Sequence, residues 1–207
     1  MFERFRTYFY PSDNVNFNSH KEKNTFTTSE DITKQVNPAD KGICGPTANS
    51  YTEYQMGKRT HEFMEGTPQQ IYNNAAEVRK HQEDLLARHQ DGLHNAFVDN
   101  KVNYEPVFHN INDLKTPEGV EKATSKGSHS ILTFQAVGEE KNLHQVALGR
   151  DFERSGQCYF FDSNLPGGER RGDCHRLFTH TAETIKTKSH PQAEKILVAT
   201  DKTNNRL

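Results

Sequence analysis

SILTFQAVGEEKNLHQVALGRDFERSGQCYFFD, residues 130–162, is the stretch from which the fold can be predicted. Its side chains alternate with period 2 and predict three strands, at 130–137, 143–150 and 157–162. The two polar connections between these strands have the length and composition of hairpin loops. The stretch therefore predicts an antiparallel sheet.

Helical patterns precede and follow these strands. A helix is predicted from Pro46 to Met56, with Gly57 as its stop, and another from Thr67-Pro68 to about Gln90. The remaining predicted elements are a strand at 105–111, a helical turn at 117–125, a helix at about 176–188 and a strand at 195–200. A helical N-terminal half and an antiparallel C-terminal sheet make an α+β fold.

The composition is polar for a chain of 207 residues, with 32% hydrophobic residues and a mean hydropathy of −0.95. The length predicts one domain, and the shortage of apolar residues predicts that part of the chain is solvated. Residues 11–40 are rich in Asn, Ser, Thr, Lys and Asp, so we expect them to be mostly irregular. The sequence thus predicts a polar lead-in at 1–40 and a folded domain at 41–207.

The near-neutral charge and the absence of a long apolar segment argue against nucleic acid and membrane as partners. Lys and Arg total 26 against 28 Asp and Glu, a net charge of −2, so we expect no nucleic-acid partner. No segment approaches the roughly 20 apolar residues of a membrane helix, which predicts no integral membrane segment. The N-terminus lacks the apolar run of a Sec signal peptide, although specialised secretion systems need none.

One cysteine lies at the predicted start of a helix, in the sequence Lys41-Gly-Ile-Cys-Gly-Pro-Thr47. Proline suits the first turn of a helix, and Gly45 is expected to let the backbone turn sharply. The free N–H groups and the positive end of the helix dipole would stabilise a thiolate at Cys44. Cys44 is therefore a candidate nucleophile, and its alternative is a small buried side chain.

The chain has three cysteines, an odd number without the spacing of a zinc ribbon or a disulfide framework. This usage predicts a free thiol and a reducing compartment. Cys158 is predicted to be a buried thiol in a strand. Cys174 follows the charged stretch Glu169 to Asp173, which is predicted to be a surface loop.

A base and a carboxylate follow from the register of the second hairpin. If its loop centres on residue 153, His144 faces Asp162 and Leu148 faces Cys158 on one side of the sheet. Opposed side chains have Cβ atoms about 5 Å apart, which is close enough for an imidazole to bind a carboxylate. The sequence therefore predicts a His144–Asp162 pair.

The first hairpin extends the same face of the sheet. A loop centred on residue 140 places Ala136 beside His144 and Phe134 beside Val146, so the face carries an apolar stripe. The helix that begins at Cys44 is the predicted cover for this stripe. A thiol, an imidazole and a carboxylate then form a Cys–His–Asp arrangement for nucleophilic catalysis.

The main alternative base is His129, at the start of the first of the three strands. Its hairpin partner would be Asp151, in the far turn, whereas His144 has a carboxylate beside it. We therefore favour His144 as the base. Asn164 is expected to stabilise the turn after the third strand, or to orient Asp162.

Three patches of the sequence resemble a known family. Gly42-Ile-Cys44, Leu143-His-Gln-Val-Ala-Leu148 and Tyr159-Phe-Phe-Asp-Ser-Asn164, followed by Gly167-Gly168, are similar to the YopT-like effector cysteine proteases of bacterial pathogens. Ser163 stands where the family's aromatic-Asp-Pro-Asn segment has proline. Cys44 is followed by Gly-Pro and not by the Gly-Ser-Cys-Trp of papain.

The resemblance implies a papain-like fold and a cysteine protease with the triad Cys44, His144 and Asp162. It also implies a virulence effector, secreted by a specialised bacterial system, that cleaves a host protein in the host cytoplasm. Family members place an amide a few residues before the cysteine to complete the oxyanion hole. Asn37 is the first candidate and Gln35 the second, whereas an ionised Asp40 has no proton to donate.

No cofactor or metal is expected. His81, His89 and His94 lie on or beside one predicted helix, but their spacing gives no i, i+4 pair for a metal ion. Two alternative functions remain open: a glutamine deamidase or transglutaminase-like acyl transferase with the same triad, and a non-catalytic binding module on the same fold.

Overall fold

A six-stranded antiparallel sheet forms the centre of the computed structural model, which describes residues 28–40, 42–88, 104–138, 143–151, 155–165 and 167–202. The strand order is β1-β6-β2-β3-β4-β5. The strands are β1 (Tyr104–Asn110), β2 (His129–Gln135), β3 (Leu143–Arg150), β4 (Gln157–Phe161), β5 (Glu169–Asp173) and β6 (Lys195–Asp201).

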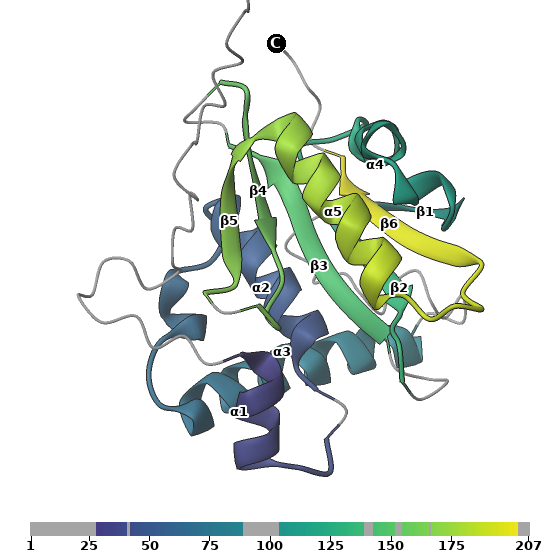
Figure 1. The fold of residues 1–207 in the computed structure, drawn as a ribbon. Helices are drawn as coiled ribbons and strands as arrows, with labels where there is room; N and C mark the ends of the chain where they lie inside the picture. The colour runs from purple at the N-terminus through teal and green to yellow at the C-terminus, as the bar shows by residue number, and fades with distance from the viewer. Residues whose placement is uncertain are drawn as a thin grey trace, which may run out of the picture.

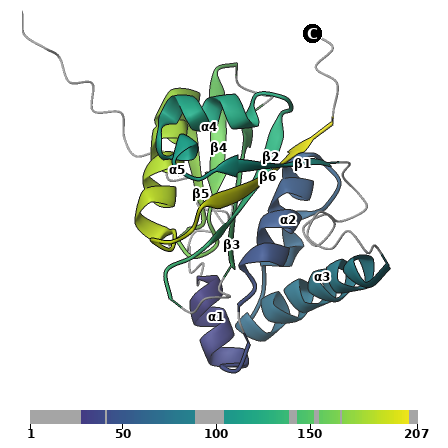
Figure 2. The ribbon, with the colours of Figure 1, turned by 90° about the vertical axis from the view of Figure 1, so that its right-hand side faces the viewer.

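Helices cover both faces of this sheet. Helices α4 and α5 lie on one face, α2 lies on the other, and α1 and α3 pack beside α2 (Figures 1 and 2). The helices are α1 (Ser29–Val36), α2 (Cys44–Gln55), α3 (Pro68–Arg88), α4 (Pro117–Thr124) and α5 (Cys174–Lys188), with short 3-10 turns at His61–Met64 and Asp113–Lys115. No helix in these ranges is long and apolar enough to cross a membrane.

The predicted α+β class and most predicted elements are confirmed. The structure contains the predicted helices and strands with boundaries that differ by one or two residues, including the capping box at Thr67 and Gln70. Positions 89 and 90, at the predicted end of the long helix, lie outside the described residues. Two elements, α1 and β5, were missed.

The predicted apolar stripe exists, but a different helix covers it. Leu132, Phe134, Val146, Leu148 and Phe160 belong to one buried cluster. The helix side of this cluster comes from α4 and α5, with Val120, Leu177, Phe178, Ala182 and Ile185. The prediction that α2 covers the stripe was wrong, because both faces of β3 are buried and α2 takes the opposite one.

The face under α2 is built around one tyrosine. Tyr51 stacks on Phe161 with ring centroids 4.1 Å apart, and it also packs on Ala147 and Tyr159. These residues are odd-numbered on β3 and β4, as the period of a strand requires. Tyr51 therefore fixes α2 across β3 and β4, so that its first residue lies near the start of β3.

Helix α1 shows that the end of the lead-in is part of the folded core. Residues 11–40 were predicted to be mostly irregular, but 29–36 form a helix whose Ile32 is fully buried against Ile43 and Ile71. The Thr28 hydroxyl caps this helix by accepting from the Asp31 backbone N–H. Positions 1–27 of the predicted lead-in lie outside the described residues.

Strand β5 occupies the stretch that was predicted to be a charged surface loop. Its Glu169 is buried and accepts from the Tyr51 hydroxyl, and Arg171 contacts Glu169 and, at 2.7 Å, Asp151. The charges of this edge strand thus face a buried polar network. Charged edge strands also resist pairing with other chains.

The predicted hairpin registers were each wrong by one pair of positions. The structure pairs Phe134 with His144 in the first hairpin and Leu148 with Phe160 in the second. A shift of two residues leaves each side chain on its predicted face, whereas a shift of one would expose the core. Cys158 consequently pairs with Arg150 and not with Leu148.

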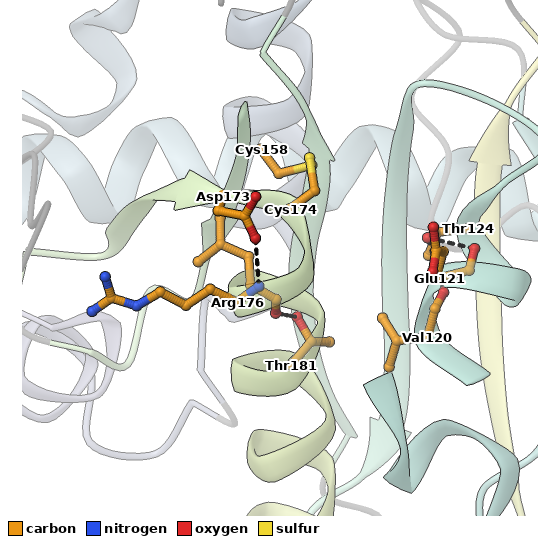
Figure 3. The surroundings of a disulfide bond; sticks show 9 residues. Val120, Glu121, Thr124, Cys158, Asp173, Cys174, Arg176 and Thr181 are labelled. Atoms are coloured by element: carbon orange, nitrogen blue, oxygen red, sulfur yellow. Dashed lines mark hydrogen bonds between the residues drawn. A yellow bond between two sulfur atoms is a disulfide. The ribbon is translucent and has the colours of Figure 1, made fainter. Parts of the chain in front are cut away.

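Cys158 and Cys174 form a disulfide, so the predictions of a buried thiol at Cys158 and of cysteines without a disulfide framework were wrong. The bond joins β4 to the first residue of α5, with a Cα separation of 4.8 Å (Figure 3). Asp173 caps this helix by accepting from the Arg176 backbone N–H. Cys44 remains as the free cysteine.

Reduction of this disulfide is expected to destabilise the protein. The bond closes a loop of 16 residues, so its loss should lower the free energy of unfolding by about 3 kcal/mol and the melting temperature by about 6 to 12 °C. Thermal denaturation of a Cys44→Ser variant, with and without a phosphine reductant, measures this effect. A Cys44→Ser/Cys174→Ser variant should not respond, and an unchanged melting temperature in Cys44→Ser would contradict the prediction.

Candidate active site

A cleft of about 600 Å³ opens at the start of α2. Its walls come from α1, from the segment before α2, from the facing ends of β2 and β3, and from the C-terminal end of α5. Cys44 and His144 both line this cleft. The structure therefore brings the predicted nucleophile and the predicted base to one opening.

Cys44 is the first residue of α2, and its thiol lies beside the start of β3. Its Sγ is 3.7 Å from the carbonyl oxygen of Leu143, the residue before His144. Enclosure of the thiol raises its pKa, but hydrogen bonding to the His144 imidazole, the charge of that imidazole and the Gln145 backbone N–H together lower the pKa below its ordinary value. A lowered pKa is expected of a nucleophilic cysteine.

His144 is buried between the thiol and a carboxylate. Its Nε2 lies 3.0 Å from Oδ1 of Asp162, which leaves Nδ1 for the thiol. Burial opposes protonation, but hydrogen bonds to Asp162 and Cys44 and the charges of both raise the pKa of His144 to about 10. The structure thus favours a thiolate–imidazolium pair.

Asp162 is fully buried and is held by three donors. Oδ1 accepts from His144 and, at 2.9 Å, from the Asn164 backbone N–H, while Oδ2 accepts from Lys188 Nζ at 2.8 Å. Burial raises the pKa of Asp162, but the His144 and Lys188 contacts hold it well below its ordinary value. The carboxylate is therefore ionised and fixed in orientation.

One partner of this carboxylate agrees with the sequence prediction and another was missed. Asn164 supports Asp162 through its backbone N–H, in the turn where it was expected to act. Lys188 was missed, because it lies 26 residues away at the end of α5 and nothing in the local sequence marks it. Its contact with Asp162 depends on the packing of α5 on β4, which the sequence does not show.

A buried amide network sets the distance between α2 and β3. Gln145 accepts from Asn49 at 3.3 Å and donates to Thr133 at 2.9 Å. A Cβ on Gly45 would lie 2.8 Å from Gln145 Oε1, so this glycine allows a close approach. The sharp turn predicted at Gly45 instead occurs at Gly42, whose φ is +110°.

The segment before Cys44 is held by α3. Arg79 donates to both oxygens of Asp40, at 2.6 and 2.7 Å, and to the carbonyl oxygen of Gly42. Asp40 also accepts from the Tyr72 hydroxyl and, at 3.2 Å, from the Gly42 backbone N–H. Burial raises the pKa of Asp40, but these donors lower it overall, so Asp40 is an acceptor, as the sequence predicted.

Replacing Arg79 with methionine should therefore loosen this segment and destabilise the protein by about 1 to 3 kcal/mol at neutral pH. The folded-state pKa of Asp40 is lowered, so the contribution of Asp40 is present above its unfolded pKa and is lost as the pH falls through its folded pKa. Urea unfolding of the wild type and Arg79→Met at about pH 7 and about pH 3 measures both effects. The difference between the proteins should shrink at the lower pH, and a constant difference would contradict the role of Asp40.

The alternative base lies away from the cleft. His129 is buried, its Nδ1 is 2.7 Å from the Tyr159 hydroxyl, and its backbone N–H donates to Asp201. Its strand partner is Gly149 and not Asp151. The structure therefore places His129 in the packing between the sheet and α2.

The two candidate oxyanion donors are not brought to the thiol. The Asn37 side chain donates to the Tyr72 hydroxyl at 3.0 Å, Gln35 is exposed, and neither residue lines the cleft. Their assignment stays a prediction. The backbone N–H of Cys44 is next to its own thiol, and in the first turn of α2 it has no hydrogen-bond partner within the helix. It is therefore a candidate donor to the oxyanion.

The histidines considered for a metal site give no cluster in the described part of the chain. His81 is exposed on α3, while 89 and 94 lie outside the described residues. No group of three or more His, Cys, Asp or Glu side chains within the described ranges is arranged to hold a metal ion.

Comparisons with known proteins relate the chain to one fold. No family model matches the sequence, and no curated protein matches it. The structure is similar to the crystal structure of the Pseudomonas avirulence protein AvrPphB, with a TM-score of 0.52 and 15% sequence identity, over 84% of this chain and 96% of that chain. The fold is therefore papain-like, as the sequence resemblance implied.

Proposed function

We propose that the protein is a thiol hydrolase of the cysteine protease type that cleaves a protein substrate. The observation that carries this proposal is the arrangement at the cleft: Cys44 and His144 line the same opening, and Oδ1 of Asp162 lies 3.0 Å from Nε2 of that imidazole. This order of groups is that of a nucleophile, a general base and an orienting carboxylate.

The reaction begins at the thiolate. Cys44 Sγ attacks the carbonyl carbon of the scissile amide, and the resulting oxyanion lies near the Cys44 backbone N–H at the start of α2. The His144 imidazolium gives its proton to the amide nitrogen, the carbon–nitrogen bond breaks, and a thioester remains. Neutral His144 then removes a proton from water, whose oxygen attacks the thioester and releases the acid and the thiol.

The biological setting is proposed by analogy with an avirulence protein of similar fold and with the YopT-like sequence patches. We propose that the chain is an effector, exported by a specialised bacterial system, which acts on a host protein inside the host cell. Asn37 and Gln35 are the amide donors that the resemblance suggests, but neither lines the cleft, so the donor that we propose for the oxyanion is the Cys44 backbone N–H.

A peptide mixture prepared from a eukaryotic cell extract tests this proposal without knowledge of the substrate. The wild-type protein should create new peptide termini that mass spectrometry detects and that a Cys44→Ala variant does not create. Conversion of glutamine to glutamate without chain cleavage would show that the protein is a deamidase and not a protease. If no product depends on Cys44, and if Cys44 is alkylated no faster than a free cysteine, the protein is a non-catalytic binding module.

A further inference from the structure

Lys188 contributes the donor to the second oxygen of the buried Asp162. Its Nζ lies 2.8 Å from Oδ2, while His144 and Asn164 bind Oδ1. The Lys188 side chain is 35% exposed and lines the cleft, whereas Asp162 is fully buried. The two oxygens of the carboxylate therefore have different partners on different elements.

The backbone around Lys188 is fixed to the sheet on both sides. Val137 donates its backbone N–H to the Lys188 carbonyl oxygen at 2.9 Å, and His190 donates to the Gln135 carbonyl oxygen at 2.8 Å. Ser189 forms a bridge with Ala136. The end of α5 is thereby anchored to the end of β2, and the lysine is presented to the carboxylate from a rigid support.

Separate donors on the two oxygens have a geometric consequence. A carboxylate with one partner can rotate and exchange its oxygens, whereas donors on both oxygens fix its plane. We propose that Lys188 is a positioning residue that acts through Asp162, holding the carboxylate plane that in turn orients the His144 imidazole toward Cys44. This inference rests on the proposed function, because it assigns a role within the same site.

Other charged groups near this carboxylate do not share that geometry. The charge of Asp162 opposes the effect of burial on Arg170 and His180, whose pKa values are lowered overall. Arg170 donates to the Glu169 carbonyl oxygen, and the His180 ring packs edge-on against Phe160. Burial lowers the pKa of His180, which favours its neutral form. Lys188 thus bonds directly to Asp162, on the oxygen that His144 does not use.

The same helix provides a matched control. Lys186 lies two residues earlier, is exposed and pairs with Glu183. Lys186→Met removes one positive charge from the end of α5 without touching Asp162, whereas Lys188→Met removes the charge and the donor. Lys188→Arg keeps both, and Lys188→Gln keeps a donor without the charge.

The test measures alkylation of Cys44 by iodoacetamide from about pH 5 to about pH 9, because this probe requires no substrate. Lys188→Met should slow alkylation about tenfold at about pH 6, Lys188→Arg should restore it to within about twofold, and Lys186→Met should match the wild type. If Lys188→Met does not fold, Lys188→Ala, which also removes the donor, takes its place and should be slower than Lys186→Met, whereas Lys188→Gln should stay closer to the wild type.

Proton NMR of His144 separates positioning from charge. Removal of a nearby positive charge alone would favour the imidazolium and raise the pKa of His144, whereas loss of the oriented hydrogen bond to Asp162 would lower it. We expect a lower pKa in Lys188→Met, and a higher one would overturn the inference. Equal alkylation rates in Lys188→Met and Lys186→Met would also overturn it. Slow alkylation of the wild type, independent of His144, would instead refute the proposed function.

Discussion

Alanine in place of His144 is expected to slow the alkylation of Cys44 about 100-fold at about pH 6. In the folded protein the imidazole lowers the pKa of the thiol against the opposing effect of its enclosure. Without the imidazole, the enclosure of the Cys44 thiol still raises its pKa, and the main group that lowers this pKa is gone. The pKa of the thiol should then lie near or above its ordinary value. A thiol with a pKa of about 8.5 is ionised to about 0.3% at pH 6, and the higher nucleophilicity of such a thiolate offsets part of the loss.

The measurement is the rate of carboxamidomethylation of the peptide that contains Cys44, followed by mass spectrometry. The matched control is His175→Ala, which removes an exposed histidine near the start of α5 and should leave the rate unchanged. The pKa of His144 is raised to about 10, so the imidazolium and the fast rate should persist from slightly acidic to alkaline pH. Equal rates in His144→Ala and in the wild type would remove His144 as the partner of the thiol.

The sequence predicted the faces of the sheet better than it predicted the pairing of the strands. Which face a residue occupies depends on burial, so His144 and Asp162 were correctly assigned to one side. The pairing depends on the turns, and polar turns of five or six residues do not specify one register. The His144–Asp162 contact survived this error because a two-residue shift moves side chains along a face and not through it.

What the sequence could not reveal depends on contacts between distant elements. Lys188 meets Asp162 only because α5 packs on β4 and ends at the cleft. The Lys188 contact thus requires the path of α5 across the sheet, and the local sequence of a helix does not contain that path. Cys174 meets Cys158 because it directly follows β5, whose Gly172 pairs with Cys158 on β4, and the sequence did not predict this strand.

The two missed elements were hidden by their composition. Helix α1 is short, polar and preceded by residues of the same kind, and its burial depends mainly on Ile32. Its first backbone N–H, at Ser29, donates to the Ser163 carbonyl oxygen, which ties the helix to the turn that follows Asp162. Strand β5 consists mostly of charged residues, so a search for alternating apolar residues does not find it.

Asparagine in place of Asp162 is expected to reduce the rate constant of substrate cleavage by at least about 100-fold and to destabilise the protein by about 3 kcal/mol. The new amide can accept from His144 Nε2, but its NH₂ group then faces the ammonium of Lys188, so that two donors meet and the lysine loses its partner. Loss of the negative charge also lowers the pKa of His144, so the alkaline limit of Cys44 alkylation should move to lower pH.

The stability difference should depend on pH in a defined direction. The folded-state pKa of Asp162 is lowered, so its contribution is present above the unfolded value and is lost as the pH falls through the folded value. Urea unfolding should therefore show a large difference between the wild type and Asp162→Asn at neutral pH and a smaller one in acid. The control Asp113→Asn changes an exposed carboxylate and should alter neither stability nor alkylation. An Asp162→Asn protein with the wild-type alkaline limit would mean that His144 is held by its packing against Phe134 and not by the carboxylate.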